Sequence, residues 1–471
     1  MLSLVSMILC LASTYSLGER VEISGKGRMR FRLVAPDIAA ESIQGISGEY
    51  LRRGFDARTR LELGIAYRLA NPLRLGAAVR LSNEEADATA YPPDLVSTRA
   101  VAGWWWAEFR KGIVEATVGA YDASFTPLTL MRWDLSDNPL GSGSACCAVA
   151  MGGLRGSSLE EFVADYKLEG ARLVLRPGSL QGTAVFARTA LPLETRTYAQ
   201  YLGGLRAHYD LYCSWAMTRA RFGVTGLRVS DDRNSVTMAQ HPPLRSDVLG
   251  ADLELPILGQ FALLGEWAYS LRDDNTRIPD PESRGSGINA GFRFGDRENL
   301  DAQLQYVRSD PDFFPLMRAL SCPRDRHGIR ASGVLRNRML GAVNTSFSAY
   351  AKFQQEVRPM LGSVFTAGQY PGRYWIAAAT SRLEPWYGYS FGIDDEWRHN
   401  TRRDDPVTAA HDETIGATEV IASLIAGYRF TLQNTIQLKY ALVRHDEQAN
   451  SYHGQLAYWA HLPSLELNLK F

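Results

Sequence analysis

The dominant feature of the chain is an alternation of apolar and polar residues that runs through most of its length. Between residues 57 and 69 the odd positions are mostly apolar, whereas the even ones include Arg58, Arg60 and Glu62. The same alternation returns in residues 73–81, 249–255 and 436–442. Successive side chains of a strand point to opposite faces, so this period predicts strands with one apolar face. A soluble sandwich would be divided into domains of about 100 residues. No Pro/Gly/Ser-rich linker divides this chain, which favours one closed sheet.

The end of the chain indicates which kind of closed sheet this is. Residues 465–471 alternate without a break and end on Phe471, which is typical of the last strand of outer-membrane β-barrels. We expect Phe471 to be the signal that the barrel-assembly machinery reads. Leu465, Leu467 and Leu469 are expected to face lipid, and Glu466, Asn468 and Lys470 to face water. Pro463 changes the parity relative to Tyr458 and Ala460, which predicts a β-bulge there.

The amino-terminal segment and the overall hydropathy agree with an exported barrel. Residues 2–17 form an apolar segment of the length of a signal-peptide core, followed by small and polar residues. We therefore expect a signal peptide at residues 1–18 and a single barrel domain at residues 19–471. The alternative, a membrane anchor, is less favoured because a spanning helix needs ~20 apolar residues. Mean hydropathy is slightly negative, as expected for an all-β, transmembrane, antiparallel up-and-down barrel with a wet inner face.

Composition and motifs argue against several other function classes. The net charge of +0 gives no bulk field for nucleic acid, and the 8 histidines lack the paired spacing of a zinc site. Gly-x-Ser-x-Gly, Walker and His-Glu-x-x-His motifs do not occur. Acidic pairs such as Asp231-Asp232 and Asp273-Asp274 fall in different expected loops. We therefore expect no enzyme activity, cofactor or metal. As partners of the outer surface we expect outer-membrane lipid and lipopolysaccharide.

Short and long links alternate along the chain. The short ones are residues 71–72, 111–112, 177–180, 213–214, 256–259, 295–298, 337–338, 384–385 and 432–435. The long ones are residues 35–53, 82–98, 123–158, 231–246, 273–284, 309–326, 356–373 and 400–414. Outer-membrane barrels have short periplasmic turns and longer outer loops. Nine short turns predict 20 strands, with 18 nearly as well supported and 16 as a further alternative, and both chain ends in the periplasm.

Aromatic residues give an independent indication of a membrane boundary. On the outward parity, those next to the short links are Tyr67, Phe109, Tyr209, Phe294, Tyr387, Phe430 and Phe471. Amphipathic rings prefer the boundary between hydrocarbon and headgroups. A strand preference for aromatic residues is the alternative explanation, but it gives no reason for rings at one level. We expect a periplasmic aromatic girdle.

Residues 59–141 carry a set of ordered motifs. They comprise the hairpin TRLELGIAYRL and NPLRLGAAVRL with arginine on its inner face, a strand ending WAEF, and a loop with Phe-x-Pro, Trp-Asp and Asp-Asn-Pro. This stretch resembles the amino-terminal part of bacterial outer-membrane porins and, more distantly, alginate-export-type outer-membrane channels. The triple tryptophan at 104–106 and the pair Cys146-Cys147 depart from those families. Porin relatives often form trimers, so a homotrimer is a further expectation from the resemblance.

The link at residues 123–158 is too long for a structureless connection. The resemblance to porins implies that it bends into the lumen and narrows the pore, which a barrel of 16 or more strands would otherwise leave open. The expected pore-lining residues are Arg58, Arg60, Arg80, Trp104, Trp106, Glu108, Arg132, Asp134 and Asp137. Opposed charges there would select solutes by charge and size. The alternative is that these are solvated inner-wall charges paired with one another.

Tryptophan and cysteine residues leave two details open. Trp104 and Trp106 are expected to point inward, where they either stack on a saccharide or, as we favour, pack beneath the infolded loop. Cys322 lies in a long link, as do Cys146 and Cys147, so we expect a disulfide between Cys322 and one of that pair in the oxidising periplasm. Cys213 at a short turn is expected to be free.

Three functions fit this sequence. The favoured one is a porin-like channel that passes small hydrophilic solutes by diffusion through a charged, loop-constricted lumen. The first alternative is a selective channel that imports or exports an oligosaccharide or polysaccharide. The second alternative is a plugged barrel whose outer loops act as a receptor or adhesin.

Overall fold

The computed structural model describes residues 20–38, 42–44, 50–82, 100–130, 168–190, 198–236, 242–277, 283–296, 299–313, 315, 325–340, 343–357, 372–403, 414–447 and 457–470. The expected signal peptide, the cysteines Cys146, Cys147 and Cys322, and Phe471 lie outside these residues. The predictions made for them therefore stay predictions.

The described residues form strands joined by turns and links. The strands are β1 (Val21–Pro36), β2 (Ser42–Gln44), β3 (Tyr50–Arg52), β4 (Gly54–Ala70), β5 (Leu73–Ser82), β6 (Ala100–Lys111), β7 (Val114–Tyr121), β8 (Leu168–Leu175), β9 (Leu180–Ala190), β10 (Ala199–Cys213), β11 (Thr218–Asp232), β12 (Arg245–Leu258), β13 (Phe261–Asp273), β14 (Ser283–Gly295), β15 (Leu300–Ser309), β16 (Arg326–Leu340), β17 (Val343–Glu356), β18 (Arg373–Trp386), β19 (Tyr389–Arg403), β20 (Thr414–Arg429), β21 (Thr435–Glu447) and β22 (Ala457–Lys470). One 3₁₀ turn, η2 (Ser214–Ala216), connects β10 and β11. Among the described residues, no helix is long and apolar enough to cross a membrane.

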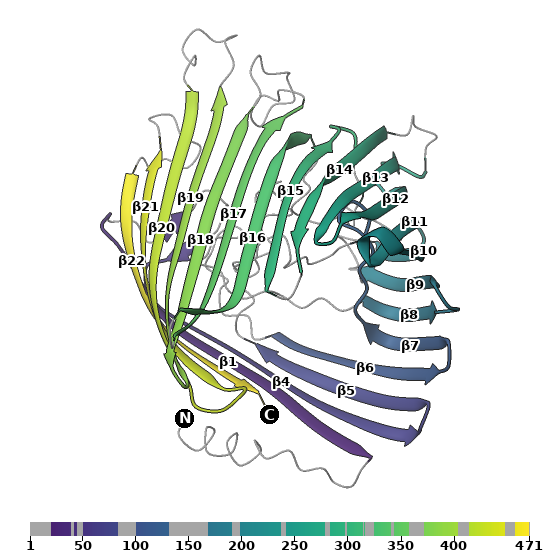
Figure 1. Cartoon of the computed structure of the whole chain (residues 1–471), viewed down its shortest axis with the longest axis horizontal. Helices are drawn as coiled ribbons and strands as arrows, with labels where there is room; N and C mark the ends of the chain where they lie inside the picture. Colours follow the sequence, from purple (N-terminus) through teal and green to yellow (C-terminus); the bar gives the residue numbers. More distant parts are fainter. Residues whose placement is uncertain are drawn as a thin grey trace.

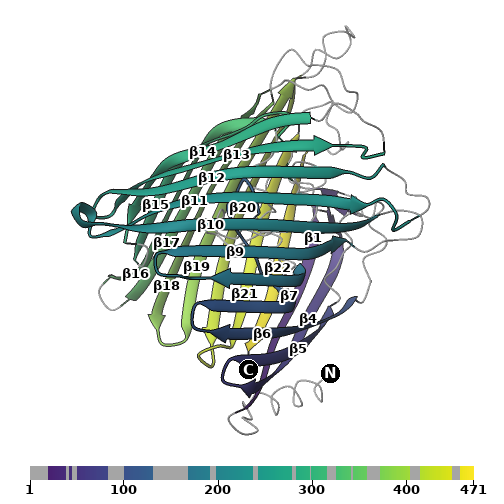
Figure 2. The same cartoon turned by 90° about the vertical axis from the view of Figure 1, so that its right-hand side faces the viewer.

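The sheet closes on itself. Each strand from β4 to β22 pairs antiparallel with the next, and β1 pairs with both β4 and β22, as Figures 1 and 2 allow the reader to follow. In the part of the chain that the structure describes, the barrel contains 20 strands, and β2 and β3 form a separate hairpin. The all-β, up-and-down barrel and the favoured strand number are confirmed, and the alternative of 16 strands is wrong. Closure leaves no unpaired edge for lipid to contact.

The two faces of the barrel differ as the alternation predicts. On β4, Leu63 and Ile65 are exposed on the outside, while the neighbouring Ala66 points inward and is buried. On β1, Arg30 and Arg32 point inward and are buried. The outer surface therefore exposes a continuous set of apolar side chains, which is stable only in hydrocarbon.

Two predicted short turns are displaced. Residues 337–338 lie inside β16, where pairing with β17 is irregular between Leu335 and Arg338. Residues 384–385 lie inside β18, and the chain turns at Tyr387 and Gly388 instead. Gly388 has φ +86, a conformation that glycine adopts without steric cost. Pro385 is tolerated because it falls in the irregular pairing between Leu383 and Trp386, where no ladder N–H is needed.

The predicted bulge at Pro463 is wrong. Pairing between β21 and β22 runs without a shift from Thr435 opposite Asn468 to Asp446 opposite Ala457. The parity therefore never changes, and Leu462 points inward together with Tyr458 and Ala460. These residues belong to a buried apolar cluster on the inner wall, against which Ile38 of the link after β1 packs. Because these inward residues are apolar, the sequence pattern wrongly predicts that the strand changes face at Pro463.

The six described members of the expected aromatic girdle are exposed. Tyr67, Phe109, Tyr209, Phe294, Tyr387 and Phe430 are all among the exposed large side chains. Each lies beside or in a short turn, and the rings of Tyr389 and Tyr428 pack at a centroid distance of 4.8 Å near the same end. This arrangement matches one aromatic belt of an outer-membrane barrel.

Candidate functional site

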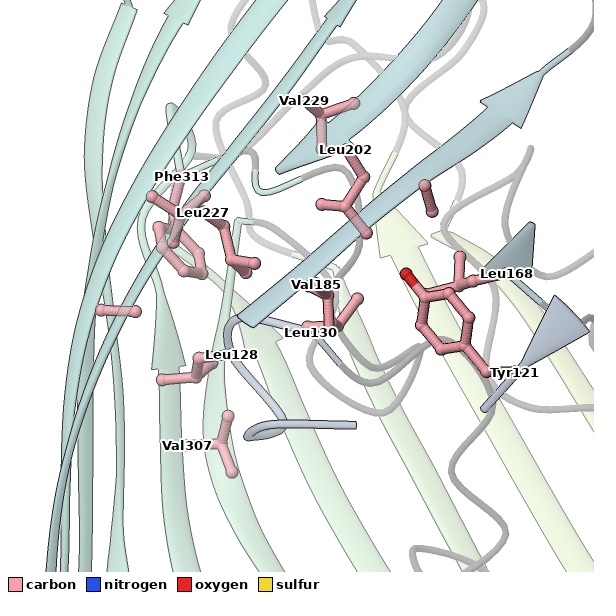
Figure 3. Close-up of a cluster of buried hydrophobic side chains, with 13 residues drawn as sticks. Tyr121, Leu128, Leu130, Leu168, Val185, Leu202, Leu227, Val229, Val307 and Phe313 are labelled. Atoms are coloured by element: carbon pink, nitrogen blue, oxygen red, sulfur yellow. The ribbon is translucent and has the colours of Figure 1, made fainter. Parts of the chain in front are cut away.

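The link after β7 begins by turning into the barrel and lying on its inner wall. We call its described residues, 122–130, the inner segment. Leu128 and Leu130 are fully buried. They pack in one cluster with inward side chains of β7 to β13 and β15, as Figure 3 shows. The cluster comprises Tyr121, Leu128, Leu130, Leu168, Val185, Ala187, Leu202, Leu227, Val229, Val248, Ala268, Val307 and Phe313.

The inner segment is a compact turn. The backbone N–H of Phe125 donates to the carbonyl of Leu130 at 2.6 Å, and that of Thr129 donates to the carbonyl of Thr126 at 3.1 Å. The two threonine hydroxyls are 2.6 Å apart and hydrogen bond to each other. Local hydrogen bonds thus satisfy polar groups that would otherwise be buried without partners. The turn is held with its leucine side chains against the wall.

One carboxylate of the wall anchors the turn. The backbone N–H of Leu128 donates to Oε1 of Glu266 on β13 at 2.7 Å, and both groups are buried. The side chains of Thr126 and Asn289 also hydrogen bond to Glu266. Glu266 therefore ties the inner segment to a strand that lies 138 residues further along the chain.

Glycine residues on the inner wall make room for the inner segment. A Cβ added to Gly250 on β12 would lie 2.7 Å from Cγ2 of Thr129. A Cβ added to Gly204 on β10 would lie 3.3 Å from the Phe125 ring and 2.4 Å from Leu227. Contacts below 3.0 Å require something to move. The missing side chain at Gly250 therefore makes room for the turn, whereas the closest neighbours of Gly204 are side chains of the wall itself.

A second segment enters the lumen in the same way after β15. Phe313 is fully buried and belongs to the same cluster as Leu128. A Cβ on Gly285 would lie 2.1 Å from the Phe313 backbone nitrogen, and one on Gly287 would lie 2.7 Å from its ring. The hydroxyl of Ser286 donates to Asp310 at 2.7 Å. Two links thus cover adjoining parts of one wall.

Charged side chains of the inner wall are held in pairs and networks. Glu115 on β7 is buried and accepts from Arg172 at 2.5 Å and from Arg176 at 3.0 Å. Arg172 also donates to the carbonyl of Asp122, where the inner segment begins, at 3.0 Å. Further along the same wall, Arg206 on β10 donates to both oxygens of Asp252 on β12 at 2.7 and 2.8 Å. These paired charges are not among the predicted pore-lining residues.

The structure describes three of the predicted pore-lining side chains. Trp104 and Trp106 point inward and are half-buried, whereas Trp105 is 59% exposed on the outside. The ring of Trp106 lies over Gly76, where a Cβ would be 2.1 Å from it. Glu108 accepts from Arg110 at 2.6 Å.

The other predicted residues lie on two strands and in the link after β7. Arg58 and Arg60 belong to β4, and Arg80 belongs to β5 opposite Glu62. Arg132, Asp134 and Asp137 lie outside the described residues. Their role in lining the pore stays a prediction.

Sequence reasoning did not identify Leu128, Leu130 or the part that Glu266 plays in anchoring them. The sequence does contain a signal for this contact. Several strands from β9 to β13 carry small or apolar residues at inward as well as outward positions. The inward apolar residues Val185, Leu227 and Val248 are examples. An apolar patch facing a wet lumen requires a cover, and that cover is the inner segment.

Comparison with known proteins assigns the chain to no family. No protein-family model matches the sequence, and no curated protein sequence matches it. The outer-membrane protein OpdK of Pseudomonas aeruginosa is 10% identical with a TM-score of 0.45, covering 95% of this chain and 99% of that one. OprD of the same organism is 9% identical with a TM-score of 0.43, covering 98% and 96%. OccAB4 of Acinetobacter baumannii is 9% identical with a TM-score of 0.40, covering 96% and 99%. The expected distant similarity to alginate-export channels is not supported.

Proposed function

We propose that the chain is an outer-membrane channel through which small hydrophilic solutes diffuse. The observation that carries this proposal is the inner segment seated on the inner wall of a 20-stranded barrel. Barrels of 16 to 18 strands already enclose an aqueous channel. A larger barrel passes solutes selectively only if something narrows it, and the inner segment is placed to do so.

Inner-wall chemistry supports passage of polar solutes. Toward the short-turn end, Arg110, Arg74 and Glu22 remain substantially exposed although they point into the barrel. Deeper in the wall, Arg206 and Asp252 form a nearly buried pair. Charges of both signs along the wall favour hydrated solutes over apolar ones. Arg132, Asp134 and Asp137, on the continuation of the inner segment, belong to the proposed constriction.

Solute flux into liposomes tests this proposal. The full-length protein is reconstituted in vesicles, and the swelling rate is measured with uncharged sugars of increasing size. We expect swelling that slows steeply as the sugar approaches the width of the constriction. A barrel that is plugged and acts as a receptor would give no swelling above that of protein-free vesicles.

A second candidate is a channel selective for saccharides, which the inward tryptophans Trp104 and Trp106 favour. An aromatic ring stacked on a ligand face contributes about 0.5–1.5 kcal/mol, which is roughly twofold to tenfold in affinity. If saccharides bind there, oligosaccharides block the ion current, and Trp106→Ala weakens the block by that factor. Trp105→Ala is the matched control, because Trp105 faces lipid. Current that no oligosaccharide blocks favours the general channel.

Export and assembly complete the proposal. Residues 1–18 would direct export, and Phe471 would be read by the barrel-assembly machinery. A homotrimer and a disulfide between Cys322 and Cys146 or Cys147 remain predictions from the sequence. Gel filtration with light scattering and non-reducing peptide mapping test these two points.

A further inference from the structure

One charged side chain points outward from the middle of a strand, where the barrel would meet lipid. Asp395 lies near the middle of β19, between the outward residues Ile393 and Trp397, and is exposed. In the part of the chain that the structure describes, its carboxylate forms no hydrogen bond or ion pair. The outward Arg444, by contrast, lies near the end of β21 and is paired with Asp446 at 2.8 Å. Because a charge facing hydrocarbon is costly, Asp395 requires a partner from outside its own barrel.

A hydrogen-bond donor faces outward three strands away. His461 on β22 is exposed, and Nδ1 of its ring is hydrogen-bonded to the hydroxyl of Tyr440 on β21. When Nδ1 accepts this bond, Nε2 carries the proton and donates to an acceptor outside the barrel. Strand register places Asp395 and His461 in one row, with Ala422 and Leu442 between them. Since neighbouring strands lie about 4.8 Å apart, the two side chains of one copy cannot reach each other.

The two groups lie at the same depth relative to the membrane boundary. Trp397 lies two residues from Asp395, and Trp459 lies two residues from His461, each toward the outer end of its strand. Both tryptophans face outward and are exposed. Such rings prefer the level of the headgroups. Asp395 and His461 therefore both lie just inside the hydrocarbon layer.

The surroundings of the two groups differ in shape. Ala379 on β18 and Ala422 on β20 pair directly with Asp395. Small residues allow another transmembrane surface to approach closely. On the other side, the ring of Tyr440 is 43% exposed and stands beside His461. One side is thus shallow and carries an acceptor, and the other projects and carries a donor.

We propose that this face, β19 to β22, is an interface between copies of the chain, in which Asp395 of one copy accepts a hydrogen bond from His461 of the next. The four strands lie side by side, as Figure 1 shows. A carboxylate and an imidazole N–H form a charge-assisted hydrogen bond, which neither group can make within one copy. The interface depends on the barrel lying in a membrane, not on what passes through its lumen.

The spacing of the two groups selects the number of copies. Each strand of a 20-stranded barrel turns the wall by about 18°, so β19 and β22 face directions about 54° apart. In a closed ring of three copies, the directions from one copy to its two neighbours differ by roughly 60°. A ring of four needs roughly 90°, and a pair has one direction only. The geometry therefore fits a ring of three with β20 and β21 at its axis, and it gives the homotrimer predicted from the sequence a contact surface.

Cross-linking of the full-length protein in the membranes of expressing cells tests the contact. Chains with Asp395→Cys and chains with His461→Cys carry different affinity tags, are co-expressed, and are treated with a short thiol-reactive cross-linker. We expect a product that carries both tags. Ile288→Cys in place of His461→Cys is the matched control, because Ile288 is exposed on the outer face of β14, far around the barrel. No product with the proposed pair, or an equal amount with the control, would overturn the proposal.

Light scattering of the purified protein measures how strongly the copies associate. Asp395→Leu or His461→Ala should weaken association at least about tenfold, because each removes a hydrogen bond to a charged group. The double variant Asp395→His with His461→Asp should recover part of the association, since the ring then contains the same pair in reverse. Asp247→Asn is the control, because it removes an outward carboxylate on β12. It should associate like the wild type.

The outcomes separate this interface from the proposed channel. A monomeric wild type, or a trimer that Asp395→Leu and His461→Ala leave unchanged, would overturn the interface. Each barrel has its own lumen, so liposome swelling per chain should be the same for Asp395→Leu and the wild type. Absence of swelling in both, together with the expected cross-link, would contradict the channel and support the interface.

Discussion

Single residues decide where the inner segment lies. Gly250 and Gly204 leave space on the wall, and Glu266 supplies an acceptor for the Leu128 N–H. The parity of β13 predicts that Glu266 points inward, but it does not reveal a partner from a link 138 residues away. The partner depends on the path of the chain between strands, which alternation does not encode.

Replacement of Glu266 tests this anchor. Glu266→Leu leaves the buried Leu128 N–H without an acceptor, at a cost of about 1–3 kcal/mol. We expect the inner segment to leave the wall part of the time, seen as added noise in the open-channel current. Glu266→Gln, which retains an oxygen acceptor, should be much closer to the wild type. Identical current noise in all three proteins would show that Glu266 does not hold the segment.

At the scale of elements, the alternation predicts the strands well and their facing residues almost everywhere. β4, β5 and the end of β22 have the predicted outward faces. The predicted faces are wrong where inward positions carry apolar residues, as at Tyr458 and Ala460. Alternation shows that the two faces of a strand differ, but it does not show which face points outward. Turn positions fail for a different reason. Gly388 provides the left-handed conformation that a short turn uses, whereas Pro385 only resembles a turn signal.

Cysteine scanning of β22 distinguishes a continuous strand from a bulged one. The continuous register places Trp459 in lipid and Ala460 on the inner wall. We expect a fluorophore at Trp459→Cys to be quenched strongly by a lipid-soluble quencher, and one at Ala460→Cys to be quenched weakly. The reverse order would restore the bulge at Pro463.

The whole molecule is a closed barrel whose two ends differ in the length of their links. Closure follows from β1, which pairs with β4 and β22. The apolar outer face and the aromatic residues beside the short turns support its placement across a membrane. The sequence predicts this architecture because the apolar outer positions and the aromatic residues beside the turns recur along the chain. The position of the inner segment depends instead on contacts between particular residues, which the alternation does not reveal.

The direction of insertion has its own test. Asp274, in the link after β13, should lie outside the cell, and Gln433, in the short turn after β20, should lie in the periplasm. In intact cells, a membrane-impermeant maleimide should label Asp274→Cys at once. It should label Gln433→Cys only after the outer membrane is permeabilised. Labelling of Gln433→Cys alone in intact cells would mean that the barrel is inverted.

The central claim is that a lumen narrowed by the inner segment conducts. Single-channel conductance in planar bilayers tests it most directly, with the wild type compared with Gly250→Leu and Gly333→Leu. Leucine at 250 must displace Thr129, whereas leucine at 333 only enters lipid. We predict steady conductance in the wild type, a larger and noisier conductance in Gly250→Leu, and no change in Gly333→Leu. A wild-type barrel that carries no current, or a Gly250→Leu conductance equal to that of the wild type, would contradict the claim.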